Sequence, residues 1–186
     1  MQMLHHTGTL TMETARLVLR RAKITDVKPM FDNWASDPEV TKFLTWPPHT
    51  NVEVTETIIK NWMAHYKDPD YYQWVIALKD EPDNPIGSIN ADCDDATESA
   101  TIGYCIGKRW WRQGIMTEAL QAVMDLLFET VGMNRVAATH DKNNPNSGKV
   151  MQKCGMQYEG TLRQAGRNNQ GICDSCCYAL LAQDRV

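Results

Sequence analysis

The alternation of hydrophobic and polar positions divides this chain into short strands and helices. Between Ser99 and Gly107, small or polar residues alternate with Ile, Tyr and Ile, which predicts a strand that the glycine ends. From Thr117 to Val131 the apolar side chains recur at helical spacing, and Thr117 is expected to cap that helix. The residues between them form a basic loop with one glycine. The centre of the chain is therefore predicted to be strand, loop and helix.

The same two patterns predict the remaining elements. Strands are expected over residues 14–21, 72–79, 86–93, 135–139, 157–162 and 173–181, and helices over 26–36, 53–66 and from about 146 to 154. A dense turn signal at 80–85 separates two of the strands, which predicts an antiparallel meander together with the strand before Gly107. The strand, helix, strand order after Ser99 implies one parallel pair with a right-handed crossover.

Length and charge narrow the class of protein. At 186 residues and 42% hydrophobic, the chain is long enough for one domain with a core, expected over residues 14–182, and residues 1–13 are expected to be flexible. A net charge of −4 disfavours a nucleic-acid partner, because phosphate backbones attract clustered Lys and Arg. No apolar run approaches the roughly 18 residues that suggest a membrane span, so a cytoplasmic protein is expected.

The cysteines raise the question of a metal. Three of the six, Cys173, Cys176 and Cys177, lie close together, but a structural zinc site needs a second pair of ligands at suitable spacing, and none stands out. We expect reduced cysteines that pack as small hydrophobic residues, and no metal.

The loop before the central helix has the properties of a phosphate site. Backbone N–H groups at a helix start and the helix dipole attract anions, Gly114 permits close approach, and Arg112 adds a positive charge. The loop lacks the Gly-Lys-Ser/Thr of a P-loop and the three glycines of a dinucleotide site. Residues 111–116, Trp-Arg-Gln-Gly-Ile-Met, instead resemble the acetyl-CoA loop of the GNAT N-acetyltransferases, although Trp111 and Met116 depart from its general pattern. The longer string, Trp-Trp-x-Gln-Gly-x-Met-Thr-Glu-Ala, resembles the branch of ribosomal-protein N-terminal (alanine/serine) acetyltransferases.

A second motif supports the same resemblance. Residues 140–156 are similar to the family segment Asn-x-x-Ser/Ala-x-x-Leu/Val-x-x-Lys-x-Gly-Phe, and the matching positions are Asn144, Ser147, Val150, Lys153 and Gly155. With the opening strand, the resemblance covers roughly residues 14–182. It implies an α/β (α+β) fold: a mixed, mostly antiparallel sheet of about seven strands with helices on both faces, whose parallel pair splays at the acetyl-CoA site.

The resemblance also implies a co-substrate and its ligands. Acetyl-CoA would donate its acetyl group directly to an amine. By motif position, backbone groups of Tyr104, Cys105 and Ile106 would hold the pantetheine. Asn144 would contact the CoA arm, although Asn-Asn-Pro is also ordinary turn chemistry. The pyrophosphate would bind the main chain of the loop, at Arg112, Gln113, Gly114, Met116 and Thr117.

The group that protonates the leaving thiolate is less clear. Many family members use a tyrosine at the position that Met151 occupies here. Ser147 lies one turn earlier on the same face and is the candidate general acid, while its alternative role is to bond within the first turn of the helix. His140 and Glu98 end and begin strands near the expected crevice, so each could relay a proton or be structural.

The absence of a clear base favours an α-amine as the acceptor. An α-amine with a pKa near 8 is neutral about one time in ten at pH 7, whereas a lysine amine costs roughly 4 to 5 kcal/mol to deprotonate. The aromatic segment 41–50 is either a packed loop or a wall of the acceptor site. The leading interpretation is acetylation of a protein or peptide N-terminus. The alternatives are a small amine such as a drug, polyamine or amino acid, and a non-catalytic CoA-binding module; a monomer or homodimer is expected.

Overall fold

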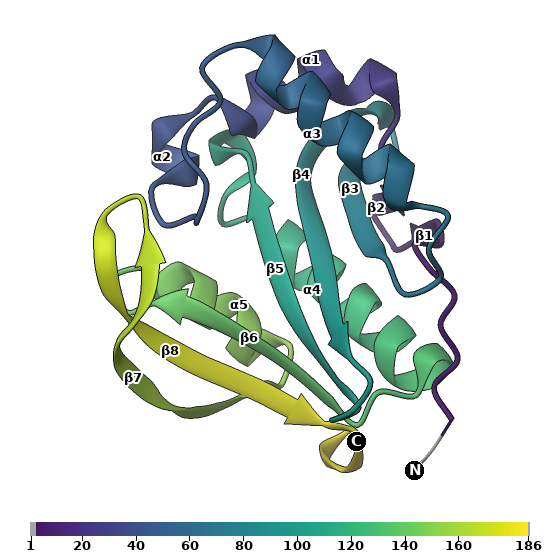
Figure 1. Cartoon of the computed structure of the whole chain (residues 1–186), viewed down its shortest axis with the longest axis vertical. Helices are drawn as coiled ribbons and strands as arrows, with labels where there is room; N and C mark the ends of the chain where they lie inside the picture. The colour runs from purple at the N-terminus through teal and green to yellow at the C-terminus, as the bar shows by residue number, and fades with distance from the viewer. Residues whose placement is uncertain (1–2, 186) are drawn as a thin grey trace.

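The computed structural model describes residues 3–185, and these form one mixed sheet in the order β1-β2-β3-β4-β5-β6-β8-β7 (Figure 1). All neighbouring strands are antiparallel except β5 and β6. This confirms the predicted fold class with one more strand than expected. The strands are β1 (Met12–Glu13), β2 (Leu17–Arg20), β3 (Tyr72–Leu78), β4 (Glu81–Asp94), β5 (Ser99–Ile106), β6 (Arg135–Asp141), β7 (Gln157–Asn168) and β8 (Gly171–Leu181).

Helices cover both faces of the sheet. In Figure 1, α1 to α3 cross the upper part of the sheet, and α4 lies behind the strands. A 3₁₀ turn precedes α1, and π-helical turns extend α1 to residue 35 and α4 to residue 131. The helices are α1 (Val27–Met30), α2 (Pro38–Thr41), α3 (Val52–His65), α4 (Ile115–Asp125) and α5 (Pro145–Lys153). No helix within residues 3–185 is long and apolar enough to cross a membrane.

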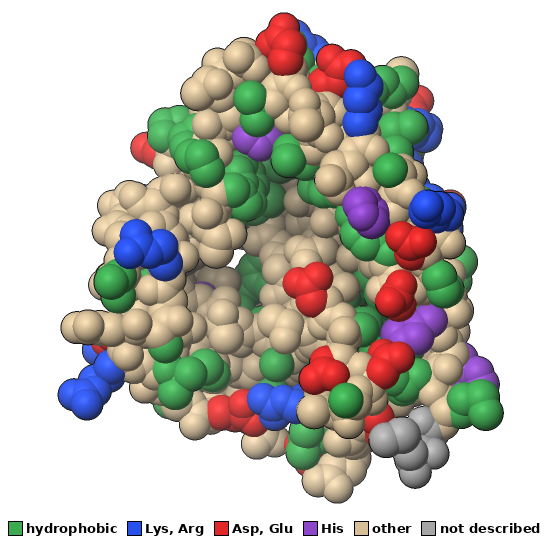
Figure 2. Space-filling view, viewed as in Figure 1, with side chains coloured by type: hydrophobic (Ala, Val, Ile, Leu, Met, Phe, Trp, Pro, Cys, Tyr) green, Lys and Arg blue, Asp and Glu red, His purple; other side chains and the backbone are tan. Residues whose placement is uncertain are grey.

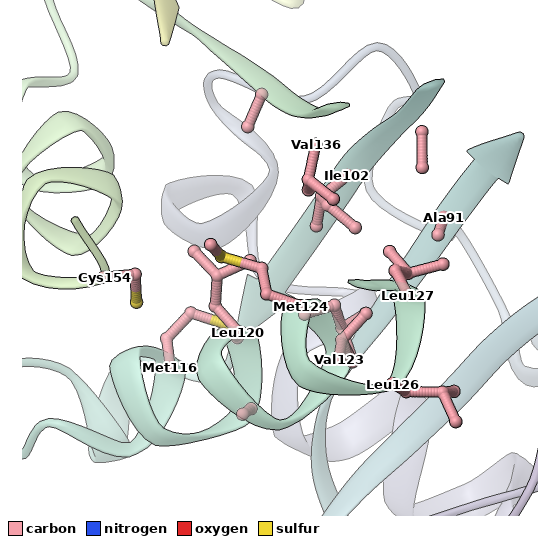
Figure 3. Close-up of a cluster of buried hydrophobic side chains, with 14 of the residues drawn as sticks. Ala91, Ile102, Met116, Leu120, Val123, Met124, Leu126, Leu127, Val136 and Cys154 are labelled. Atoms are coloured by element: carbon pink, nitrogen blue, oxygen red, sulfur yellow. The ribbon is translucent and has the colours of Figure 1, made fainter. Parts of the chain in front are cut away.

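The larger core lies between α4 and the sheet. Figure 3 shows Leu120, Val123 and Met124 of α4 and Leu127 of its π-helical extension near Ile102 of β5 and other apolar side chains, and each of these five is at least 96% buried. Burial of one such side chain contributes roughly 1.5–3 kcal/mol. A smaller core joins α1 and α3 to the opposite face of the sheet. Residues of β3 and β5 belong to or pack against both cores, so the middle of the sheet supports the site from both faces.

The parallel pair is short, and this creates the opening that the fold class predicts. β5 and β6 pair only from Ser99↔Arg135 to Thr101↔Ala137, after which the two strands separate. The carboxyl-terminal half of β5 therefore has a partner only on its β4 side, where the register continues to Gly87↔Ile106. Backbone groups on the β6 side of residues 102–106 are left for a ligand to bind.

Residues 3–13, part of the N-terminal segment that we expected to be flexible, make specific contacts with the domain. Met12–Glu13 forms β1 against β2. Before it, the His5 N–H donates to the Val131 carbonyl (2.9 Å), and Thr9 is 1% exposed with its hydroxyl on the Tyr71 carbonyl (2.9 Å). Individual hydrogen bonds hold this segment against the domain, and such contacts leave no periodic pattern in the sequence.

Two local predictions also need correction. The turn signal at residues 80–85 does not form a loop, because β4 already begins at Glu81 and its prolines sit where the β3–β4 register shifts. Thr117 does not cap α4. The cap is Gly114, whose φ of +75° suits glycine, and Thr117 lies inside the first turn.

Candidate active site

Two cavities meet at the carboxyl end of β5. One, of about 640 Å³, lies on the side of α3, and the other, of about 830 Å³, lies along the starts of α4 and α5. Figure 2 shows the hollowed face between the helical layer and the β7–β8 hairpin. The shared lining residues are Phe43, Leu44, Tyr104, Cys105, Asn144 and Ser147. Two ligands, one in each cavity, would therefore meet between the carboxyl end of β5 and the start of α5.

The 830 Å³ cavity has the chemistry of a phosphate site. Gly114 caps α4, and no side chain accepts a hydrogen bond from the backbone N–H groups of the first turn. The residues of this turn line the cavity, so their N–H groups are available to an anion there. The cations in its lining are Arg112, Lys149 and Lys153, and the one carboxylate, Glu39, forms an ion pair with Lys108. A polyanionic ligand with an apolar arm fits this combination, so we name it the cofactor cavity.

A clamp from the far end of the chain holds the phosphate loop. The Glu118 carboxylate accepts hydrogen bonds from Arg16 Nε (2.7 Å), the Arg16 N–H (2.8 Å) and the Thr14 hydroxyl (2.5 Å). Arg16 also donates from Nη1 to the Gln113 carbonyl (3.0 Å). Burial opposes ionisation of Glu118, but these hydrogen bonds outweigh it and lower its pKa. The sequence gives no sign that Arg16 and Glu118 are in contact, since about 100 residues separate them.

The 640 Å³ cavity, which we name the acceptor cavity, has an apolar and a polar wall. The apolar wall includes Phe43, Trp46 and Trp62, so part of the aromatic segment 41–50 lines the acceptor side. The polar wall comes from the strands and includes Ser88, Asn90 and Thr139. A large aromatic wall with a few polar groups is typical of a site for a small molecule or a chain end.

Asp141 is the one carboxylate lining the acceptor cavity among residues 3–185, and it is 7% exposed. Burial would raise the pKa of Asp141, but hydrogen bonds from the Asn143 N–H (2.7 Å) and Asn168 Nδ2 (2.6 Å) lower it overall. A carboxylate with a lowered pKa is a poor proton acceptor. His49 also lines this cavity, and burial lowers its pKa, which favours the neutral imidazole. No pattern in the sequence singled out His49.

Ser147 lies on the border of both cavities, in the first turn of α5. Asn144 caps that helix by position, and Ser147 donates its backbone N–H to the Asn144 carbonyl (3.2 Å). The Ser147 side chain does not bond to its own helix. Its Oγ lies 2.9 Å from the Tyr104 hydroxyl on β5. Met151 is 1% exposed and belongs to the core. Its thioether has no proton to donate, so it cannot take the place of a tyrosine acid.

Comparison with known proteins decides the family. The acetyltransferase (GNAT) domain family matches residues 16–157, more than half of the chain. The uncharacterized N-acetyltransferase p20 of Bacillus licheniformis is 30% identical over 175 residues, which cover 94% of this chain and 97% of that one. This chain belongs to the GNAT acetyltransferase family. It is an N-acetyltransferase by family membership.

Two further relatives of this GNAT acetyltransferase have more specific names. The ribosomal-protein-serine acetyltransferase of Escherichia coli (strain K12) is 27% identical over 157 residues, which cover 82% of this chain and 86% of that one. The structure of RimL, a ribosomal α-N-protein acetyltransferase in complex with coenzyme A, has a TM-score of 0.83 over 95% of this chain and 100% of that one. At 20% identity, the second likeness shows the fold alone.

Most residues that the sequence assigned to acetyl-CoA line the cofactor cavity of this GNAT acetyltransferase. These are Tyr104, Cys105, Ile106, Arg112, Gly114, Met116, Thr117 and Asn144. Gln113 does not line it; its side chain donates to the Arg109 carbonyl (2.9 Å) and stabilises the loop. The Ile106 carbonyl already accepts a hydrogen bond from the Trp111 indole (2.8 Å). Met116 is 5% exposed and its side chain packs in the core, so only its backbone is available to a ligand.

The two suggested proton relays of this GNAT acetyltransferase have different surroundings. Glu98 directly precedes β5, and its backbone carbonyl accepts hydrogen bonds from the N–H groups of Asn134 and Arg135. It therefore lies at the end of β5 where β5 pairs with β6, opposite to the end that borders the cavities. His140 is in the lining of the acceptor cavity, and its Nδ1 lies 2.7 Å from the Asp141 carbonyl.

The cysteines show no metal chemistry in the described part of this acetyltransferase. All six are free thiols, and no group of three or more His, Cys, Asp or Glu within residues 3–185 is placed to hold an ion. Cys105 lies at the junction of the cavities, where burial raises the pKa of its thiol. A protonated thiol is a poor nucleophile, which favours direct transfer over an acetyl-cysteine intermediate.

Proposed function

We propose that this GNAT acetyltransferase transfers acetyl from acetyl-CoA to the α-amine of a protein or peptide by direct attack. The observation that carries the proposal is the junction of the two cavities at Tyr104, Cys105, Asn144 and Ser147. Acetyl-CoA bound with its phosphates at the start of α4 would place its thioester near this junction. An amine in the acceptor cavity would approach from the other side of β5.

The cofactor cavity fits acetyl-CoA by charge and shape. Arg112, Lys149 and Lys153 complement phosphates, and the uncapped start of α4 offers N–H donors. The splayed β5–β6 pair leaves β5 backbone groups for the amides of the pantetheine arm. The E. coli relative, which is named as a ribosomal-protein acetyltransferase, supports a protein acceptor.

The acceptor cavity favours an α-amine over a lysine side chain. Its one carboxylate, Asp141, has a lowered pKa and is a poor base. An α-amine supplies a neutral nucleophile about one time in ten at pH 7, and a lysine amine about once in two to three thousand. Little help from a base is then required.

A small amine is the second candidate acceptor. The wall of Phe43, Trp46 and Trp62 would suit a compact apolar or aromatic group next to the amine. The experiment that separates the candidates is titration of the protein with acetyl-CoA by calorimetry, followed by thiol release with α-amine peptides, polyamines and small aromatic amines. Release with the peptides supports the proposal. Faster release with polyamines or small amines would replace it, and binding without release on any amine would favour a CoA-binding module.

A further inference from the structure

The hydroxyl of Tyr104 joins the two elements that border the reaction centre. Tyr104 Oη lies 2.9 Å from Ser147 Oγ and 3.0 Å from the Ser147 carbonyl oxygen. The tyrosine comes from the carboxyl end of β5 and the serine from the first turn of α5. Both residues line both cavities. The motif assigned only the backbone of Tyr104 to ligand binding, so its side chain is unexplained.

The hydrogen atoms of this pair permit two arrangements. The Ser147 carbonyl can only accept, and each hydroxyl has one hydrogen to donate. In the first arrangement Tyr104 donates to the carbonyl and Ser147 donates back to Tyr104, so the serine proton points away from the cavities. In the second, Tyr104 donates to Ser147 Oγ, and the serine O–H is free to turn toward the junction. Only the second arrangement lets Ser147 protonate a leaving group.

We propose that Tyr104 is a positioning residue for Ser147: its hydroxyl donates to Ser147 Oγ and thereby directs the serine O–H to the thioester sulfur at the junction of the cavities. The inference rests on the proposed function, because it assigns a role at that site. A negative charge that develops on the sulfur attracts the serine proton and selects this arrangement. A donor behind the serine also stabilises charge that develops on Oγ during proton transfer.

The proton transfers balance without an outside base. The neutral amine attacks the thioester carbon, so the C–N bond forms and the carbonyl π electrons move to oxygen. When the oxygen re-forms the carbonyl, the C–S bond breaks and its electron pair goes to sulfur. Ser147 gives its hydroxyl proton to sulfur and takes a proton from the ammonium nitrogen of the intermediate. Tyr104 keeps its own proton throughout and acts only through its hydrogen bond.

The surroundings of Tyr104 suit this role. Burial raises the pKa of the Tyr104 phenol above 10.0, and this effect exceeds the opposing effect of the hydrogen bond with Ser147. The phenol therefore stays protonated wherever the amine reacts, so it remains a donor. Loss of this one hydroxyl should weaken proton transfer while it leaves the phosphate contacts of the co-substrate unchanged.

The first test is a double-mutant cycle with Tyr104→Phe and Ser147→Ala. Tyr104→Phe is expected to lower kcat roughly tenfold with the KM for acetyl-CoA within about twofold, and Ser147→Ala to lower kcat about tenfold or more. In the Ser147→Ala background, Tyr104→Phe should have no further effect. An equal loss in both backgrounds, or no loss in the parent chain, would overturn the inference. Tyr158→Phe is the matched control, because its hydroxyl bonds to Thr161 on the exposed strand β7 (2.7 Å).

The second test needs no acceptor, so it separates this inference from the proposed function. The thiol of bound CoA is titrated by the ultraviolet absorbance of its thiolate in the parent chain and in both variants. A serine O–H directed at the sulfur stabilises the thiolate, so its pKa should be lower in the parent chain by about one unit. The same thiol pKa in all three proteins would contradict the role of Tyr104 even if amine turnover is normal. Failure of CoA to bind would refute the proposed function itself, and the inference with it.

Discussion

A Cβ atom at position 148 would lie 2.5 Å from Nε2 of His140, so only glycine lets the imidazole pack beneath the first turn of α5. His140 Nε2 is buried and has no hydrogen-bond partner, and the His140 ring lies 5.6 Å from that of Tyr178. Gly148 follows Ser147 directly. Gly148 therefore allows the first turn of α5, which carries Ser147, to pack closely on the His140 side chain of β6.

Gly148→Ala should therefore destabilise the protein, although alanine favours a helix by about 1 kcal/mol. Overpacking at position 148 is expected to lower the free energy of unfolding by roughly 1–3 kcal/mol, measured by urea denaturation. The additional change His140→Ala should recover most of the loss by removing the clash. Asn146→Ala, at an exposed position of the same helix, is the control and should stay within about 0.5 kcal/mol of the parent. No destabilisation by Gly148→Ala would show that the imidazole moves freely.

The clamp between Arg16 and Glu118 should affect binding of acetyl-CoA more than chemistry. Arg16→Gln removes the side-chain donors to the Glu118 carboxylate and to the Gln113 carbonyl, so the phosphate loop loses its support from the residue that precedes β2. We expect the KM for acetyl-CoA to rise about five- to tenfold, while kcat at saturation stays within about twofold. Arg135→Gln, which breaks an exposed pair with Glu159 at 2.5 and 2.7 Å, should leave both constants unchanged. If Arg16→Gln lowered kcat and left the KM for acetyl-CoA unchanged, the clamp would not be what supports binding of acetyl-CoA.

The same clamp predicts a dependence of stability on acid. The pKa of Glu118 is lower in the folded protein than its ordinary value near 4.5, so its contribution is complete above that value and disappears as the pH falls through the folded pKa. Glu118→Gln should therefore be less stable than the parent at pH 7. The difference between the two in the free energy of unfolding should shrink below pH 4.5. A difference that stays constant with pH would mean that the charge of Glu118 is not what stabilises the loop.

A buried ion pair fixes the helical layer that forms the apolar wall of the acceptor cavity. Arg20 donates to both oxygens of Asp26 at 2.7 and 2.8 Å, and the two side chains are 8% and 1% exposed. Asp26→Ala leaves a buried guanidinium without its partner, which costs about 3–5 kcal/mol. Glu159→Ala breaks an exposed pair and should cost less than about 1 kcal/mol. Denaturant unfolding of Asp26→Ala and Glu159→Ala compares the two losses in the free energy of unfolding. Equal losses would show that the buried pair stabilises the fold no more than the exposed one.

The sequence predicted the sheet, and most of the residues that it assigned to acetyl-CoA line one cavity, because both depend on local patterns. Apolar periodicity located α4, although its start was predicted at Thr117 and the structure has Gly114 as the cap. The sequence named Tyr104 and Ser147 separately, and the hydrogen bond between their side chains emerged only from the structure. The same reasoning missed β1, since two residues paired by tertiary contacts carry no periodic signal.

Long-range polar contacts could not be predicted. Arg16 and Glu118 are common surface residue types, and nothing in either neighbourhood shows that they meet. The role of Gly148 depends on the rotamer of His140 across from it, and the role of His49 depends on how deeply its loop folds into the acceptor cavity. These are properties of packing, which residue types along the chain do not encode locally.

The most direct test of the central account uses two peptides that differ only at the N-terminus. Both contain one lysine; one has a free α-amine and the other a formylated one, and thiol release from acetyl-CoA is measured with each between pH 6.5 and 9. We expect release with the free α-amine alone, rising with pH to a plateau above about 8 as the α-amine loses its proton. Equal release with the blocked peptide would show that the acceptor is the lysine side chain and would contradict the account.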